Sequence, residues 1–175
     1  MRILVLGLGN DLMGDDAVGI LTANELKERL RGKADVVSTA LYGVALMELF
    51  IDYDRAIIID AAQTGDHPPG TVFEIDPSEL RPVSIPSPHY AGLPEMIDLA
   101  ARMGLEFPSV VRIFAVEAED VRTIGAGLSE SVRTSFDELL TRVESLVLEW
   151  LEEAGHHSAG SAGVKGLLRK SSKKI

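Results

Sequence analysis

Hydrophobic and polar positions along the chain divide it into short runs and longer amphipathic stretches. Five short runs have the length and composition of strands: residues 3–6, 35–38, 55–60, 71–75 and 110–116. Four longer stretches have helical spacing: residues 16–30, 44–50, 93–103 and 129–153. Residues 56–59 are apolar throughout, which is typical of a strand buried on both faces. The alternation predicts an α/β fold, an open, mostly parallel twisted sheet of about five strands with helices on both faces.

A glycine-rich turn follows the first predicted strand, with the sequence Gly-Leu-Gly-Asn-Asp-Leu-Met-Gly-Asp-Asp at residues 7–16. Such a turn usually binds a phosphate, because free backbone N–H groups and the helix dipole attract anions. Here Asp15 and Asp16 occupy that position, Leu12 replaces the third glycine of the dinucleotide fingerprint, and no lysine completes a Walker A motif. Two carboxylates suit a cation better, so the turn is predicted to line a metal-facing crevice. The alternative is that both side chains only cap the helix.

Further candidates follow other strands, because functional groups in an open α/β sheet gather beyond the carboxyl ends of its strands. Asp60 ends the third predicted strand, where an unpaired buried carboxylate would be costly, so it must meet a cation, a donor or solvent. Capping a turn over residues 61–65 is its alternative role. His89 lies in a loop that Pro86 and Pro88 restrict, although a loop histidine is often only a surface residue. Two carboxylates and one imidazole together suit a first-row divalent ion with open coordination positions.

Composition narrows the classes of function. The 175 residues are 46% hydrophobic, which predicts one α/β domain over residues 1–154 followed by a basic, flexible Gly/Ser/Lys-rich tail over residues 155–175. The net charge is −10 and all 27 acidic residues precede the tail, so nucleic acid and anionic membranes are poor partners. No apolar run is long enough to span a bilayer and no signal peptide begins the chain, which predicts a cytoplasmic protein. Without cysteine, the chain offers no thiol nucleophile, disulfide or thiolate ligand.

The phrase Gly-Leu-Gly-Asn-x-Leu-x-x-Asp-Asp-x-x-Gly after the first strand resembles the opening of the hydrogenase maturation endopeptidases. These enzymes remove the C-terminal extension from the large subunit of nickel-iron hydrogenases. Residues 69–71 and 89–93 also resemble family phrases, so the resemblance covers most of residues 1–150. It implies that Asp16, Asp60 and His89 bind the nickel carried by the large-subunit precursor, which brings its own thiolates. Asp16 and Asp60 are then the candidate catalytic residues, either of which could act as general base.

The chain also departs from the family pattern. Ala17 stands where the family often has glycine, residues 39–43 lack the phrase Asp-Gly-Gly-Thr, and residues 114–118 lack the usual proline. Two other classes of function stay open at this point. One is a nickel-binding adaptor without catalysis, and the other is a nucleotide or nucleoside enzyme on a similar sheet. His67, in a polar turn, and the histidines of the predicted tail are weaker candidates.

Overall fold

A five-stranded sheet forms the centre of the molecule in the computed structural model, which describes residues 1–80, 87, 89 and 93–167. The strands are β1 (Ile3–Leu8), β2 (Asp35–Thr39), β3 (Arg55–Ala62), β4 (Val72–Ile75) and β5 (Val110–Glu117). Their order in the sheet is β2-β1-β3-β5-β4. β4 pairs antiparallel with β5, and the other neighbouring strands are parallel. The predicted α/β fold with a mostly parallel sheet is confirmed.

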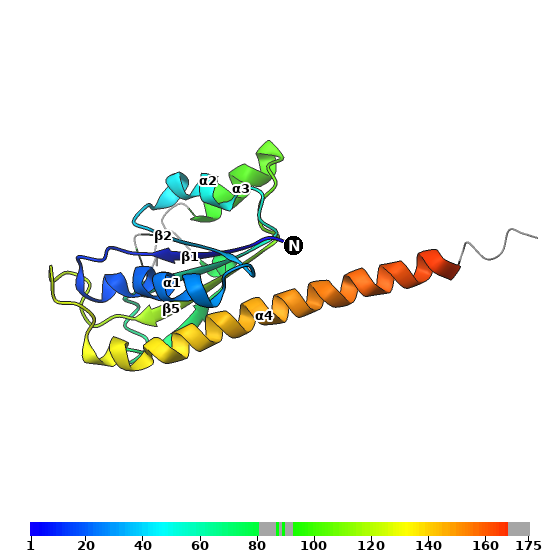
Figure 1. Ribbon diagram of the computed structural model, residues 1–175. Coiled ribbons are helices and arrows are strands. Elements are labelled where there is room, and N and C mark those ends of the chain that lie inside the picture. Colours follow the sequence, from blue (N-terminus) through cyan, green and yellow to red (C-terminus); the bar gives the residue numbers. More distant parts are fainter. Residues whose placement is uncertain (81–86, 88, 90–92, 168–175) are drawn as a thin grey trace, which may run out of the picture.

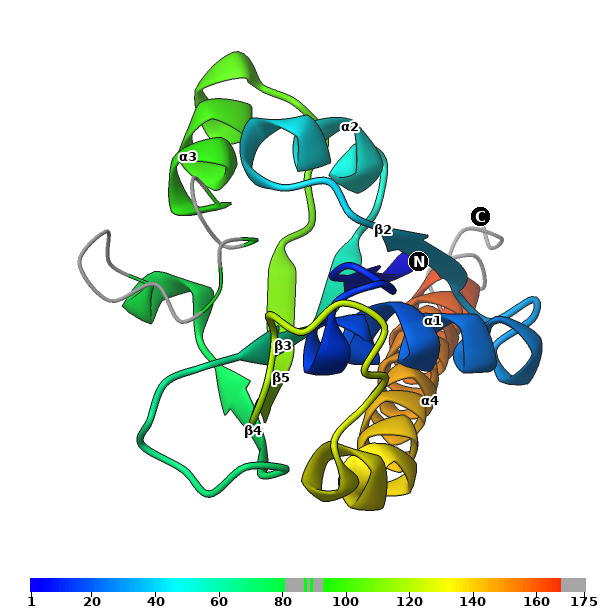
Figure 2. The ribbon, with the colours of Figure 1, turned by 90° about the vertical axis from the view of Figure 1, so that its left-hand side faces the viewer.

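Helices cover both faces of this sheet (Figure 1). The α-helices are α1 (Val18–Arg29), α2 (Met47–Phe50), α3 (Leu93–Met103) and α4 (Glu130–Leu167). The short 3-10 helices are η1 (Gly14–Ala17), η2 (Gly43–Leu46) and η3 (Pro77–Glu79). Figure 2 shows α1 and α4 on one side of the sheet and α2 and α3 on the other. Asp76 caps η3, because its side chain accepts a hydrogen bond from the backbone N–H of Ser78.

Alternate side chains of the central strands point to opposite faces of the sheet and belong to two separate hydrophobic cores. Ile3 and Val5 of β1 pack with α1 and α4, whereas Leu4 and Leu6 pack with α2 and α3. Every residue of β1 is buried, as is typical of a parallel strand between two helical layers. The two cores fix the sheet from both sides and leave the carboxyl ends of its strands to carry the polar groups.

Several elements extend beyond their predicted ends, and β3 and α4 are the two that bear on the site and the tail. β3 continues past Asp60 to Ala62, because residues 60–62 still pair with β5. α4 continues to Leu167, whereas the sequence predicted a helix that ends at residue 153. Three alanines between residues 154 and 162 favour the helix and no proline interrupts it, so the glycines alone do not end it. Flexibility of the tail and the predicted domain boundary remain predictions.

The length and hydropathy of the helices bear on whether the chain could span a membrane. No helix among the residues that the structure describes is both long enough and apolar enough to cross a bilayer.

Candidate active site at the carboxyl ends of β1 and β3

The turn after β1 brings Asp16 to the edge of the sheet by folding tightly on itself. Gly9 has a φ of 137°, and a Cβ atom there would lie 1.9 Å from the carbonyl oxygen of Asp16, so only glycine fits. Five backbone N–H groups of the turn donate hydrogen bonds within the protein. They are Asn10 N to Asp16 O, Leu12 N to Asn10 Oδ1, Met13 N to Asn10 O, Asp15 N to Asp120 O and Asp16 N to Met13 O. A phosphate needs such groups free, so this turn does not support the nucleotide alternative.

Asp60 lies in β3, one residue beyond the pair that Gly7 of β1 forms with Ile59. Its side chain is fully buried, and its carboxylate accepts hydrogen bonds from the backbone N–H of Ala61 at 2.8 Å and from Ser87 Oγ at 2.7 Å. Burial raises the pKa of Asp60 to about 7, against the opposing effects of His89 and Ser87. The strand continues beyond it, so the alternative role of capping a turn over residues 61–65 is not supported.

His89 faces Asp16 across the strand ends. Its Nε2 atom lies 3.6 Å from Asp16 Oδ1, and only 8% of the residue is exposed. Burial lowers the pKa of the imidazole, but the carboxylates of Asp16 and Asp60 outweigh this effect and raise it above its usual value. The buried Nδ1 atom has no hydrogen-bond partner within the described part of the chain. Pro86 and Pro88, which were predicted to restrict this loop, lie outside the described residues.

The structure brings these three side chains together although they come from distant parts of the chain. Ligand atoms of Asp16, Asp60 and His89 all lie within 4.8 Å of one another. β1 and β3 are neighbours while β2 lies on the other side of β1, so the cluster occupies the point where the strand order changes direction. The donor set of two carboxylates and one imidazole fits a divalent ion that takes its remaining ligands elsewhere.

Asp15 does not join this cluster, although the sequence predicted that both aspartates line the crevice. Its side chain is fully buried and its carboxylate accepts hydrogen bonds from the segment between β5 and α4. Helix capping does not describe the pair either. The N-cap positions belong to Met13 and Ala17, and neither cap has a side-chain hydrogen bond.

Two polar residues near the strand ends were missed by sequence reasoning. Ser87 donates to Asp60, and nothing in the sequence distinguished it from other serines of its loop. Glu117 is buried at the end of β5, where it accepts hydrogen bonds from the backbone N–H groups of Thr64 and Gly65, both at 2.9 Å. It ends an apolar run just as Asp60 does, so the same signal could have found it. Glu117 holds the loop that follows β3.

The other histidine candidates lie outside the cluster. The ring of His67 packs against that of Phe73, with 4.6 Å between their centroids. His156 is exposed on α4, and the side chain of His157 lies outside the described residues. Of the four histidines, His89 alone is brought to the strand ends among those that the structure describes.

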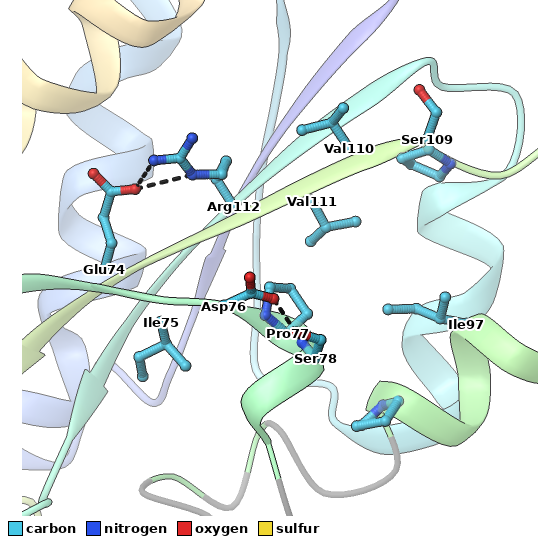
Figure 3. A pocket seen from close by; sticks show the side chains of 12 residues that line it. Glu74, Ile75, Asp76, Pro77, Ser78, Ile97, Ser109, Val110, Val111 and Arg112 are labelled. Carbon is cyan, nitrogen blue, oxygen red and sulfur yellow. Dashed lines mark hydrogen bonds and ion pairs between the residues drawn. The ribbon is translucent and has the colours of Figure 1, made fainter.

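A separate pocket of about 760 Å³ lies between β4, α3 and the start of β5. Figure 3 shows two hydrogen-bonded contacts among its lining residues: Arg112 donates to Glu74, and the backbone N–H of Ser78 donates to Asp76. None of its lining residues belongs to the cluster of Asp16, Asp60 and His89. Since the start of β5 is the end of the sheet opposite Asp60, the pocket is remote from the candidate site.

Comparisons with known proteins give one consistent result. The HycI family model, described as hydrogenase maturation protease, matches residues 20–146. The hydrogenase 2 maturation protease of Escherichia coli K12 is 29% identical over 153 residues, which are 85% of this chain and 92% of the relative. The structure of the hydrogenase maturating endopeptidase HybD from E. coli is similar with a TM-score of 0.69 at 30% identity, covering 89% of this chain and 94% of that one. The NiFe hydrogenase maturation protease HybD from Thermococcus kodakarensis gives a TM-score of 0.66 at 26% identity, covering 84% and 99%.

Proposed function

The chain belongs to the hydrogenase maturation protease family, and we propose that it removes the C-terminal extension from the large-subunit precursor of a nickel-iron hydrogenase after nickel insertion. It is an endopeptidase of that family, so the alternative of an adaptor without catalysis is set aside. The observation that carries the proposal is the group of three ligand atoms within 4.8 Å of one another at the edge of the sheet.

In this proposal the nickel is part of the substrate. The precursor supplies thiolates, and Asp16, Asp60 and His89 complete the coordination. A chain without cysteine suits this division, because it has no thiolates of its own to compete for the ion. Three protein ligands from this chain leave positions open for the precursor. Recognition of the metal then ensures that only a nickel-loaded precursor is cut.

Hydrolysis of the scissile peptide requires a water molecule to attack the carbonyl carbon and a base to accept its proton. Nickel shared with the precursor can polarise that carbonyl or the water. The two aspartates of the cluster are the candidate bases. Bound nickel would lower the pKa of Asp60 below its value in the metal-free chain, so either carboxylate stays ionised beside the cation and could accept the proton.

The test is cleavage of purified precursor with and without bound nickel. We expect the nickel-loaded precursor to be processed and the apo precursor to remain intact. Equal rates on both would refute recognition of the metal, and no cleavage of either would refute the proposed activity.

Single alanine variants test the three residues themselves. Asp16→Ala, Asp60→Ala and His89→Ala should each lose cleavage and weaken Ni²⁺ binding, because each removes one ligand from an incomplete site. His67→Ala is the matched control, since that ring lies outside the cluster against Phe73. Full activity of His89→Ala would exclude the three-residue site.

A further inference from the structure

The carboxylate of Asp15 is held by several hydrogen bonds from a distant part of the chain. It is fully buried and accepts from four donors: Glu119 N at 2.9 Å, Asp120 N at 3.0 Å, Ser129 N at 2.7 Å and Ser129 Oγ at 3.0 Å. All four belong to the segment between β5 and α4, more than 100 residues away along the chain. We call this set of contacts the Asp15 clamp.

The same two segments also meet through their backbones. The N–H of Asp15 donates to Asp120 O at 2.7 Å, and the N–H of Gly125 donates to Leu12 O at 2.8 Å. Gly14 has a φ of 45°, and a Cβ atom there would lie 2.3 Å from Asp120 O. The turn and the segment after β5 are therefore in contact too close to admit a side chain.

We infer that Asp15 is a positioning residue for the cluster, a role that rests on the proposed function. Asp15 and Asp16 are consecutive residues of η1, so fixing one fixes the backbone that carries the other. Asp16 is itself partly exposed, and its ligand oxygen must stay near His89 and Asp60. Metal ligands need to be held within about 0.5 Å of their productive positions, which a free glycine-rich turn does not provide.

The clamp also sets the charge of the site. By drawing the Asp15 carboxylate toward backbone N–H groups, it leaves the cluster with two carboxylates and one imidazole. A third carboxylate at the strand ends would repel the other two and add a competing ligand. Asp15 thus acts through Asp16 and does not touch the substrate.

Asp15→Asn tests the role with almost no change in volume. One oxygen becomes an NH₂ group, which in either orientation faces a backbone N–H that formerly had an acceptor. Titrating the metal-free chain with Ni²⁺ alone should show affinity reduced by about 10-fold or more. With nickel-loaded precursor, kcat should fall more than KM rises, because the geometry of the cluster changes and the precursor-binding surface does not.

Two variants on the partner segment and the turn give an independent check. Ser129→Ala removes one of the four donors and should weaken Ni²⁺ binding less than Asp15→Asn does. Combining the two should be less than additive, since both act on the same contact. Gly14→Ala forces the two segments apart from the backbone side and should weaken Ni²⁺ binding without altering the carboxylate.

The matched control is Val143→Ala, a core residue of α4 that lies 14 residues beyond Ser129 along the chain. It should lower Tm yet leave Ni²⁺ affinity unchanged. Asp15→Asn with a lowered Tm but wild-type Ni²⁺ affinity would reduce the clamp to a structural contact, and a wild-type chain that binds no Ni²⁺ would also refute the role. Failure of the proposed function gives a different result, because wild type would then bind Ni²⁺ without cutting the precursor.

Discussion

Replacing Asp60 with asparagine should make the metal-free protein more stable at neutral and alkaline pH while abolishing its activity. Within the described part of the chain, the buried carboxylate accepts hydrogen bonds from Ser87 and the backbone N–H of Ala61, and from no Lys or Arg. Asparagine can keep both contacts. Its oxygen accepts from the N–H of Ala61, and its NH₂ group donates to Ser87 Oγ, whose hydroxyl can turn to accept. The variant therefore removes the buried charge together with its electrostatic attraction to His89.

The size of the effect follows from the pKa of Asp60, which burial raises from 3.8 to about 7. Each pKa unit corresponds to about 1.36 kcal/mol, so ionising Asp60 in the folded chain costs about 4 kcal/mol. Because the pKa is higher in the folded state, its contribution to stability is complete below pH 4 and is lost as the pH rises to 7. Asp60→Asn cannot ionise and avoids this loss.

The assay is urea unfolding of the metal-free wild type and Asp60→Asn at intervals from pH 4 to pH 8. The two free energies of unfolding should agree near pH 4 and diverge by about 1.4 kcal/mol per pH unit until pH 7, with the variant more stable. Asp76→Asn is a control of opposite sign. A hydrogen bond from Ser78 lowers the pKa of Asp76 below 3.8, so Asp76→Asn should destabilise the protein by the same amount throughout this series, because the contribution of Asp76 is lost only at lower pH. A constant difference between wild type and Asp60→Asn at every pH would refute the reasoning.

Two further predictions concern the fold. Gly7→Ala would place a Cβ atom 2.1 Å from the carbonyl oxygen of Gly19 in α1, so we expect it to destabilise the chain by about 1–3 kcal/mol or more. An unchanged Tm would show that α1 does not pack against β1 as described. Removing residues 156–175 should leave Tm unchanged, because Trp150 is the last buried side chain of α4 among those that the structure describes, and the end of the helix projects beyond the sheet (Figure 1). A large fall in Tm would mean that this segment docks on the body.

The sequence predicted the neighbourhood of the site better than its details. Asp16 and Asp60 each follow an apolar strand, and in a parallel sheet the carboxyl ends of neighbouring strands meet at one edge. The local sequence does not show whether Asp15 or Asp16 faces that edge. The answer depends on donors at Glu119, Asp120 and Ser129, which only the folded chain brings near the turn.

Other details failed for comparable reasons. The sequence of β4 predicted a strand but carried no information about its direction, which is set by the turn at residues 63–71 returning the chain beside β5. The sequence predicts too short a helix for α4, which continues through the glycines of residues 155–166 to Leu167. Each glycine weakens a helix by only about 1 kcal/mol relative to alanine, so glycine alone does not end it. Local sequence patterns therefore predict poorly where long-range contacts set the direction of a strand, or where helix propensities are close to balance.

The turn after β1 uses its backbone N–H groups differently from the glycine turns of nucleotide-binding proteins. In nucleotide-binding proteins a glycine turn binds anions because its N–H groups point outward unpaired. Here N–H groups of residues 10, 12, 13, 15 and 16 are all donated within the protein, and the glycines serve close packing against Asp16 and Asp120. With those donors used internally, the turn presents the Asp16 carboxylate to His89 at the cluster. In the proposed function the turn therefore serves a cation in place of an anion without a change of fold, through a different use of its N–H groups.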